Sequence, residues 1–347
     1  MPASRRDLLT SLFSAATLSV AGCAAPPARG PKALHIEPDA LARAFAPVAA
    51  RARPGKLNVG VAVLDGQGQW CADETGLYPL QSVFKAPLAA AALALVDAGQ
   101  LRLNDRVRIA DEDREPWTSR LSDAVAAAPG RILDLPVADL IALAVQESDN
   151  VAADVLMRRI GGPGALTAWL VAHGVNGMRI DRYEREAQPE IAGLGAFRPE
   201  WRDRAAWIAA RDSLPPAPRE AAAAAYLDDS RDTSTAPAAL AFLKALALGQ
   251  LLKPESTALM LRLMTATSLG PHRLLAGLPP GTVLAHKTGT SATVLGITPA
   301  TNDVGLVTLP DGRRFAVVAL LKGSTGTEAQ REALIAEGAR TIVSTLG

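Results

Sequence analysis

Strand-forming patterns occur near the two ends of this chain, and helical patterns occupy the long stretch between them. Alternating apolar residues predict a strand over 57–63, which a Gly-rich turn joins to a second short strand around Trp70. Near the carboxyl end, the same alternation predicts strands over 282–286, 303–309 and 314–321. Strands so far apart in sequence share one sheet only if the chain folds back on itself.

Apolar residues at helical spacing fill the middle and both flanks of the chain. The predicted helices cover 37–52, 83–98, 137–145, 151–160, 165–173, 236–248, 255–267 and 328–346. With 347 residues, 49% of them apolar, the chain is long enough to bury a sizeable core. We predict an α+β fold, in which an antiparallel sheet from both chain ends (36–80 and 276–347) is flanked by helices and an all-helical subdomain (81–275) is inserted.

The first 23 residues have the pattern of an export signal. Paired arginines at 5 and 6 precede fifteen mostly apolar or small residues, too few to cross a bilayer. The pair resembles a twin-arginine signal, with plain secretion as the alternative. Residues 20–23 (VAGC) are similar to a bacterial lipobox, which predicts lipidation at Cys23; cleavage beyond it is the alternative. We expect an exported, periplasmic lipoprotein whose linker (24–35) tethers the domain (36–347) to the membrane.

Charge and cysteine content exclude several functions. The chain has 36 basic and 35 acidic residues, so nothing suggests a nucleic-acid partner. Its two cysteines, Cys23 and Cys71, and its four histidines lack zinc or haem spacing. We therefore expect no metal and no disulfide, and Cys71 is predicted to be a buried or free thiol.

A serine and a lysine stand three positions apart at the start of the helix predicted over 83–98. Ser82 and Lys85 therefore project from one face, where an amine of lowered pKa can help to deprotonate the hydroxyl. The chain has only seven lysines against 29 arginines, and arginine cannot give up its proton. The amine at position 85 favours a nucleophilic site over a chance Ser-x-x-Lys pattern.

Two further polar motifs lie at the ends of predicted helices or strands. Ser148-Asp149-Asn150 falls between two predicted helices, and a plain helix N-cap is its alternative interpretation. Lys287-Thr288-Gly289-Thr290 ends a predicted strand, where glycine lets a ligand approach the backbone and the lysine and hydroxyls can bind a carboxylate. An ordinary exposed strand end is the alternative, but the three motifs together favour one site.

In these motifs the chain resembles the class A serine β-lactamases, within the penicillin-recognising enzymes, over roughly residues 36–347. The motifs match the Ser-x-x-Lys, Ser-Asp-Asn and Lys-Thr-Gly elements of that family. Segments 286–291 and 300–303 look most like the branch that favours cephalosporins. The resemblance implies a monomeric hydrolase with a small-molecule β-lactam substrate and no cofactor.

The resemblance also implies a general base on an omega loop. Glu184 lies 36 residues after Ser148, where the family has the glutamate that activates the deacylating water. The alternative is a solvated charge among the neighbouring charged residues. Gln188, where the family usually has asparagine, is included among the predicted substrate-binding residues.

The chain departs from the family pattern after this glutamate. A long insert over 189–230 precedes the segment that begins at Arg231. The insert has an alanine run and residues at helical spacing (Trp201, Ala205 and Ile208), which predict a helical flap. The flap is either a lid that changes substrate access or a structured surface decoration. Arg182 and Asp232 can pair at the neck of the loop.

Two more residues complete the predicted site. Arg273, fourteen residues before Lys287, matches a position where some family members carry a guanidinium that holds the substrate carboxylate. A surface arginine is the alternative. Trp117 matches an aromatic gate beside the family's site, and a helix-packing aromatic is its alternative.

The implied chemistry is acyl transfer to Ser82, with the oxyanion held by the backbone N–H groups of Ser82 and Thr290. Lys85, or a water on Glu184, takes the serine proton, and Ser148 passes a proton to the leaving nitrogen. Asn150 is expected to receive the acylamino side chain. The full set of predicted substrate-binding residues is Asn150, Lys287, Thr288, Gly289, Thr290, Arg273, Trp117 and Gln188.

Two rival functions share parts of this pattern. A transpeptidase or carboxypeptidase acting on cell-wall peptides has the three motifs but no dedicated deacylating glutamate, so Glu184 argues against it. A catalytically silent exported lipoprotein has no chemical need for Ser82, Lys85 and Glu184 together.

Overall fold

The computed structural model describes residues 34–64, 66, 68–117 and 119–346, and its centre is one antiparallel sheet. The strand order is β2-β1-β9-β8-β7, so the two amino-terminal strands pair with the carboxyl-terminal ones through β1 and β9. This arrangement confirms the α+β fold predicted from the sequence. The strands are β1 (Lys56–Val63), β2 (Gln69–Cys71), β7 (Val283–Thr290), β8 (Thr298–Thr308) and β9 (Arg314–Ser324).

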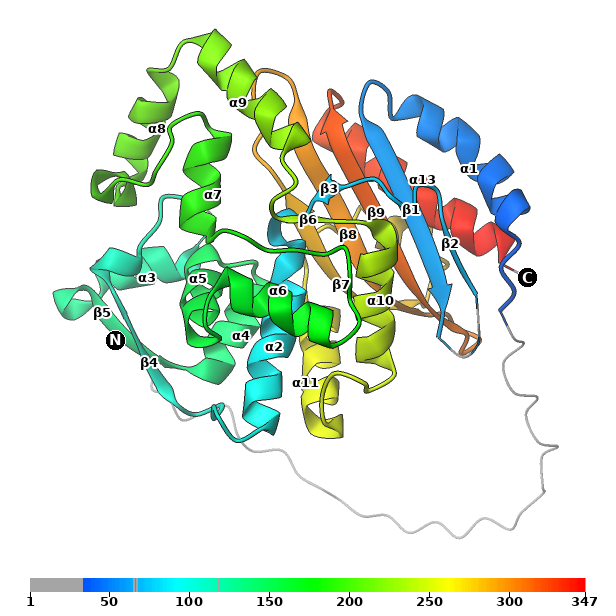
Figure 1. Ribbon diagram of the computed structural model, residues 1–347, viewed down its shortest axis with the longest axis horizontal. Coiled ribbons are helices and arrows are strands. Elements are labelled where there is room, and N and C mark those ends of the chain that lie inside the picture. Colours follow the sequence, from blue (N-terminus) through cyan, green and yellow to red (C-terminus); the bar gives the residue numbers. More distant parts are fainter. Residues whose placement is uncertain (1–33, 65, 67, 118, 347) are drawn as a thin grey trace, which may run out of the picture. The chain divides into compact units, whose positions relative to one another are not determined.

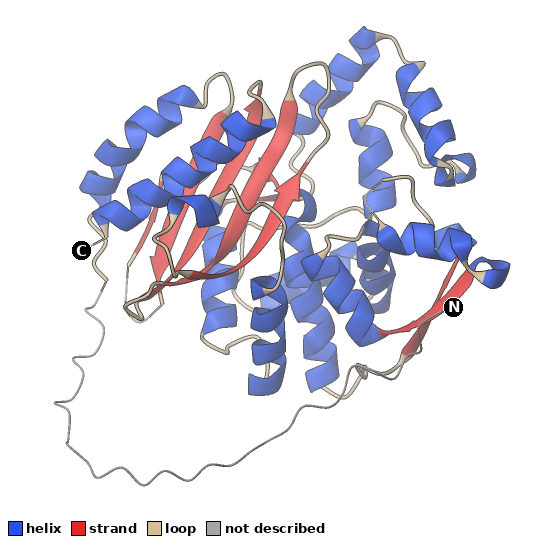
Figure 2. Cartoon of the chain, turned by 180° about the vertical axis from the view of Figure 1, so that it is seen from behind, coloured by secondary structure: helices blue, strands red, loops and turns tan. Residues whose placement is uncertain are grey.

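Helices from both chain ends cover one face of the sheet (Figures 1 and 2). Leu41 and Phe45 of α1 (Pro38–Arg51) and Ile335 of α13 (Glu328–Thr345) pack on Val59 and Val317 of the sheet. The short helix α12 (Leu274–Gly277) contacts α13. The apolar stripes of these helices and alternate residues of the strands therefore form one layer of core.

The other face of the sheet packs against α10 and the helical part of the chain (Figure 1). The central helix α2 is buried from Lys85 to Leu93, which explains why its sequence is apolar all round. The helices on this side are α2 (Lys85–Asp97), α3 (Arg120–Ala127), α4 (Val137–Gln146), α5 (Asn150–Arg159), α6 (Pro163–Ala172), α10 (Ala236–Ala247) and α11 (Pro254–Thr265).

Several small elements were not predicted from the sequence. Strands β4 (Arg106–Ala110) and β5 (Ile132–Pro136) form one antiparallel pair, and β3 (Tyr78–Pro79) and β6 (Thr233–Ser234) form another. Two-residue strands are too short to show a period of two. The single-turn helices are η1 (Gln81–Phe84), η2 (Asp111–Asp113), η3 (Pro129–Arg131) and η4 (Pro199–Arg202).

Strand β7 is longer than the predicted 282–286, and the motif 287–290 forms its last four residues, so the motif ends a strand as predicted. Its residues from Leu284 to Gly289 are all buried although three of them are His, Lys and Thr. Apolar alternation does not detect a strand whose buried positions are polar. For the same reason β8 begins at Thr298 instead of 303. The helix predicted from 83 begins at Lys85, because Val83 and Phe84 belong to the preceding η1 turn.

After α7 (Glu184–Ile191), the insert continues along the chain as further helices (Figure 1). The alanine run lies in α9 (Pro216–Asp228), as predicted. Trp201 lies in η4, whereas Ala205 and Ile208 lie in α8 (Arg204–Asp212), and the extended backbone of Asp203 separates the two helices. The Asp203 side chain accepts the Ala206 N–H and caps α8, a local competition that helical periodicity does not reveal.

The predictions for the export signal, Cys23 and most of the linker lie outside the described residues. Cys71 is buried and makes no disulfide within the described part of the chain. None of the helices that the structure describes is long and apolar enough to cross a membrane.

Candidate active site

Ser82 lies in the η1 turn that leads into α2, and hydrogen bonds with two distant segments hold the residues just before it. The Leu80 N–H donates to the Asp232 carbonyl at 2.9 Å, and the Asn302 side-chain amide donates to the Pro79 carbonyl at 2.7 Å. Gln81 has a φ of +47°, a left-handed conformation that a non-glycine residue keeps only when its surroundings impose it. The position of Ser82 therefore depends on contacts made by its predecessors.

Lys85 begins α2 and its side chain is fully buried. Its Nζ donates to the Ser148 carbonyl at 2.7 Å and to the Asn150 side-chain oxygen, and it lies 3.3 Å from Glu184 Oε1. The amine therefore joins two of the predicted motifs to the predicted general base. A buried ammonium with a carboxylate at this distance can exchange a proton with it through the serine or a water.

Ser148-Asp149-Asn150 precedes and opens α5. Its two interpretations, a helix N-cap and part of a site, apply to different residues of the motif. Asp149 caps α5 by accepting the Ala152 N–H at 2.9 Å. Ser148 has a φ of +58°, and its Oγ accepts a hydrogen bond of 3.0 Å from Lys287 Nζ. The cap on Asp149 thus fixes the backbone that places the side chains of Ser148 and Asn150 at the two lysines.

Strand β7 brings Lys287 and Gly289 close to the Ser82 turn. Lys287 is buried, and this burial together with the charge of Lys85 holds its pKa well below the ordinary value. A Cβ at position 289 would lie 2.5 Å from the Leu80 carbonyl oxygen and 3.2 Å from the Ser82 nitrogen. Only glycine fits here, because the backbone of β7 approaches the turn at van der Waals distance.

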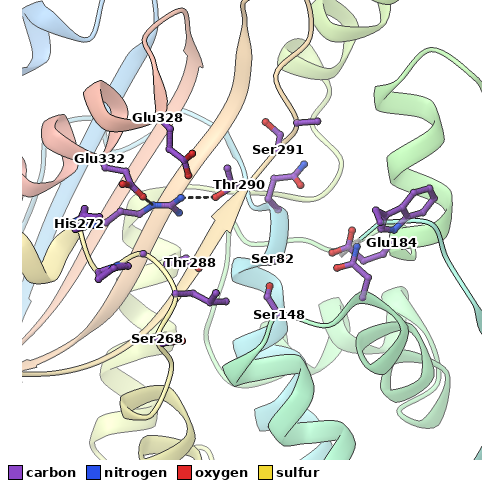
Figure 3. Close-up of a pocket in the computed structure, with 18 of the residues that line it drawn as sticks. Ser82, Ser148, Glu184, Ser268, His272, Thr288, Thr290, Ser291, Glu328 and Glu332 are labelled. Carbon is purple, nitrogen blue, oxygen red and sulfur yellow. Dashed lines mark hydrogen bonds and ion pairs between the residues drawn. The ribbon is translucent and has the colours of Figure 1, made fainter. Parts of the chain in front are cut away.

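Arg273 is buried at the edge of β7, so it is not the surface arginine of the alternative interpretation. Its guanidinium donates to Thr290 Oγ1 at 2.8 Å and to Glu332 Oε1 at 3.1 Å, as the dashed lines in Figure 3 show. The third contact is to the Asn302 carbonyl at 3.0 Å. These fixed partners hold a positive charge beside Thr290.

Glu184 is buried at the first position of α7, so it is not the solvated loop charge of the alternative interpretation. Gln188, one turn later, donates to Glu184 Oε2 at 2.8 Å. Asp154 of α5 accepts the backbone N–H groups of Glu184 and Arg185 at 2.8 and 3.1 Å. Asp154 of α5 therefore fixes the backbone at Glu184, and Gln188 of α7 holds its carboxylate.

Asp154 has a second buried carboxyl beside it, that of Glu115. Burial raises the pKa of Asp154 to about 6, and burial together with Asp154 raises the pKa of Glu115 well above its ordinary value. Arg185 Nε lies 3.9 Å from Glu115 Oε1. The pair therefore keeps a proton in the folded protein at pH values at which both carboxyls are ionised in the unfolded chain.

We expect Glu115→Gln to stabilise the protein at alkaline pH. A carboxyl with a raised folded-state pKa stabilises the fold below its unfolded pKa, and this contribution is lost as the pH rises through the folded pKa. A neutral glutamine avoids that loss, so thermal unfolding at pH 8 should occur about 2–4 °C higher than in the wild type, with little difference near pH 5.

The exposed Glu112→Gln is the control for this substitution and should leave the unfolding temperature unchanged at both pH values. Equal pH dependence of unfolding in Glu115→Gln and the wild type would show that Glu115 is ionised in the folded protein at neutral pH.

Trp117 lines the pocket and also packs on aromatic residues of the insert. Its ring meets Trp207 of α8 at 4.9 Å and Phe197 at 6.0 Å between centroids, both edge to face. Trp201 contacts both insert rings. The packing interpretation therefore describes this side chain, and through it the insert supports one wall of the pocket.

These residues surround a pocket of about 960 Å³. Ser82 and Ser148 lie in its middle, with Thr290 on one side and Glu184 on the other (Figure 3). The predicted site residues that line it are Ser82, Ser148, Asn150, Glu184, Gln188, Thr288, Thr290, Arg273 and Trp117. Lys85 and Lys287 lie buried and bond to Ser148 from two directions, and Gly289 packs on the Ser82 turn.

Sequence reasoning missed several residues of this region. Glu332 of α13 and Asp154 of α5 hold predicted site residues, and a loop over 268–272 forms part of the pocket. Asp154 lies one helical turn after Asn150, a spacing that hints at a shared face, whereas no local signal connects Glu332 to Arg273. Within the described residues, no cluster of three or more His, Cys, Asp or Glu side chains could hold a metal ion.

Comparisons with known proteins agree with this arrangement. Residues 40–346 match the model of the β-lactamase enzyme family. The chain is 32% identical over 290 residues to the extended-spectrum β-lactamase PER-1 of Pseudomonas aeruginosa, with 82% of each chain covered. The structure is similar to a β-lactamase from Chitinophaga pinensis (TM-score 0.72, 30% identity, 88% and 98% covered) and to an ancestral class A β-lactamase (0.69, 31%, 88% and 99%).

Proposed function

The chain belongs to the class A serine β-lactamases, enzymes that hydrolyse the β-lactam ring, and on this premise we propose that Ser82 is its nucleophile and Glu184 its deacylating base. The contacts of Lys85 carry this proposal, since one buried amine bonds to Ser148 and Asn150 and lies 3.3 Å from Glu184. A hydroxyl, an amine and a carboxylate in one pocket are the groups that acyl transfer followed by hydrolysis requires.

In the acylation step, Ser82 Oγ attacks the lactam carbonyl, and Lys85 or a water on Glu184 accepts the serine proton. The N–H groups of Ser82 and Thr290 stabilise the negative charge on the carbonyl oxygen. Ser148 passes a proton to the lactam nitrogen as the C–N bond breaks. Its hydrogen bond from Lys287 supports this role, because the Lys287 amine, charged once an anionic substrate is bound beside it, can resupply that proton.

The polar residues along β7 bind the substrate carboxylate. Lys287, Thr288 and Thr290 supply an amine and two hydroxyls on one strand, and Arg273 adds a guanidinium held against Thr290. An anionic group near Lys287 favours its charged form, which burial alone disfavours. Gly289 keeps this strand close to the Ser82 turn.

On the opposite side, Asn150 receives the acylamino group and Trp117 limits the space for larger side chains. In the deacylation step, Glu184 takes a proton from the water that attacks the acyl carbonyl, and Gln188 orients that carboxylate through its 2.8 Å contact. The water ends as part of the product acid, and the proton returns to Ser82. The proton that Lys85 or the Glu184 water took from Ser82 during acylation passes back to the Ser148–Lys287 pair, so the enzyme regains its starting state without a cofactor.

The proposed substrates are cephalosporins and penicillins. A similarity to PER-1, an extended-spectrum enzyme, favours a broad range over a single drug class. A wall-peptide transpeptidase is the second candidate, and the buried Glu184 beside Lys85 disfavours it, because an acyl-enzyme that is to be passed to an amine gains nothing from a water-activating base. A catalytically silent lipoprotein has no use for this geometry.

The exported location and lipid anchor are also part of this proposal. The paired arginines and the VAGC segment support export to the periplasm and lipidation of Cys23. We propose that the catalytic domain, 36–347, acts as a monomer tethered by the linker over 24–35, with the sheet and helical subdomains divided near residues 80 and 276.

The test of the nucleophile is a mass measurement. The protein is mixed with a slowly hydrolysed β-lactam, quenched in acid and digested, and we expect the mass of one opened β-lactam on the peptide that contains Ser82. The control is Ser82→Ala, which should carry no adduct under the same conditions. An adduct on another residue, or an equal adduct in Ser82→Ala, would refute the assignment.

A further inference from the structure

A buried tyrosine of the inserted segment is hydrogen-bonded to the turn that carries the proposed nucleophile. Tyr226 lies on α9, is buried, and its hydroxyl accepts a 2.6 Å hydrogen bond from the side-chain amide of Gln81. The two residues are 145 positions apart in sequence. A segment whose structure mattered only at the surface would not need a buried phenol that contacts the residue before Ser82.

Gln81 needs such a partner because of its backbone. Its φ of +47° places it in the left-handed region, which a residue with a Cβ adopts only at a cost in free energy. The contact with Tyr226 is the one side-chain hydrogen bond that Gln81 makes within the described residues. Because Gln81 directly precedes Ser82, its conformation sets the direction of the Ser82 N–H and hydroxyl.

Tyr226 is in turn held in place at the base of the insert. Arg182, which pairs with Asp232 at 2.6 Å as predicted, also contacts Glu190 at 2.5 Å and Asp229 at 3.4 Å. Glu190 lies at the start of the insert and Asp229 at its end, directly after α9. One buried guanidinium therefore fixes both ends of the insert, and with them the helix that bears Tyr226.

Tyr226 is also close to the proposed deacylation machinery. Gln81 and Tyr226 line a small cavity of about 20 Å³ together with Glu184 and Gln188. A movement of the Gln81 side chain would therefore change the space behind the Glu184 carboxylate as well as the direction of the Ser82 backbone.

We propose that Tyr226 is a positioning residue for this reaction: its hydroxyl fixes Gln81 and thereby the Ser82 N–H that receives the oxyanion. The proposal rests on the role of Ser82 given above. Tyr226 does not touch the substrate, so its effect passes through Gln81. The insert on this account is a built-in part of the catalytic scaffold, in addition to supporting Trp117.

The test is Tyr226→Phe, which removes one oxygen and keeps the ring. With a chromogenic cephalosporin we expect kcat to fall roughly tenfold and KM to stay within about twofold, because a misdirected N–H weakens transition-state binding more than substrate binding. Tyr78→Phe is the matched control, since it removes a buried phenol hydroxyl whose partner, Asp73, lies outside the pocket. Its kinetics should equal those of the wild type.

A double-mutant cycle separates positioning from a general loss of structure. If Tyr226 acts through Gln81, Gln81→Leu and the double variant Gln81→Leu/Tyr226→Phe should have the same kcat. An unchanged kcat in Tyr226→Phe, or an equal fall in both backgrounds, overturns the inference while wild-type turnover leaves the proposed function intact. A wild type that does not turn over the cephalosporin overturns both.

Discussion

Glu184→Ala is expected to turn a multiple-turnover enzyme into one that acylates once and stops. Lys85 remains as a base for Ser82, so the ring still opens, but no carboxylate is left to take a proton from the attacking water. Loss of a general base of this kind slows its step about 10²–10⁴-fold. We therefore expect a stoichiometric burst of product from a chromogenic cephalosporin, followed by a very slow phase, and an adduct on Ser82 in the intact mass.

Glu186→Ala is the matched control for this variant. Glu186 lies two residues further along α7, and its carboxylate accepts the Tyr183 N–H at 3.0 Å, away from Lys85. It should keep full turnover. Unchanged steady-state turnover in Glu184→Ala, or the absence of any adduct, would remove Glu184 from the deacylation step.

The Gly289→Ala variant is expected to lose most of its activity, because the substitution disturbs the two backbone N–H groups proposed to bind the oxyanion. The new methyl group would lie 2.5 Å from the Leu80 carbonyl oxygen and 3.2 Å from the Ser82 nitrogen, so strand β7 must move away from the turn. That movement separates the N–H groups of Ser82 and Thr290, which we propose receive the oxyanion together. Removal of one such donor costs roughly 10²–10³-fold in kcat, and we expect kcat/KM for a cephalosporin to fall by this amount.

The control for this substitution is Gly164→Ala. Gly164 lies in the first turn of α6, and a Cβ there meets no atom within 4 Å. This variant should keep its activity and be as stable as the wild type or slightly more so, because alanine favours a helix. Activity in Gly289→Ala within about threefold of the wild type would show that β7 can shift without disturbing the oxyanion donors.

The sequence was most informative where local chemistry repeats. Alternation located the sheet strands β1 and β9, and helical spacing located the helices around α2, since both patterns depend on residues close in the chain. The three motifs were recognisable for the same reason: each is a short run of fixed spacing. The structure places Ser82, Ser148 and Thr290 around one pocket, which their order in the sequence suggested but did not determine.

The sequence was least informative where a contact joins distant segments. Neither Asp154 nor Tyr226 belongs to a recognisable motif, yet one holds the backbone of Glu184 and the other holds Gln81. The two-residue strands β3 and β6 are too short to show alternating apolar residues. The buried end of β7 is polar, so apolar alternation does not detect it as strand. Such features follow from tertiary packing, which local propensity does not encode.

The most direct test of the central claim is to count hydrolysed cephalosporin molecules per enzyme molecule over time for the wild type. We expect many turnovers at a constant rate, because the proposed base Glu184, 3.3 Å from Lys85, would release each acyl group from Ser82 by hydrolysis. One molecule of product per enzyme followed by no further hydrolysis would contradict it, and would identify the chain as an acylating enzyme without a deacylation step.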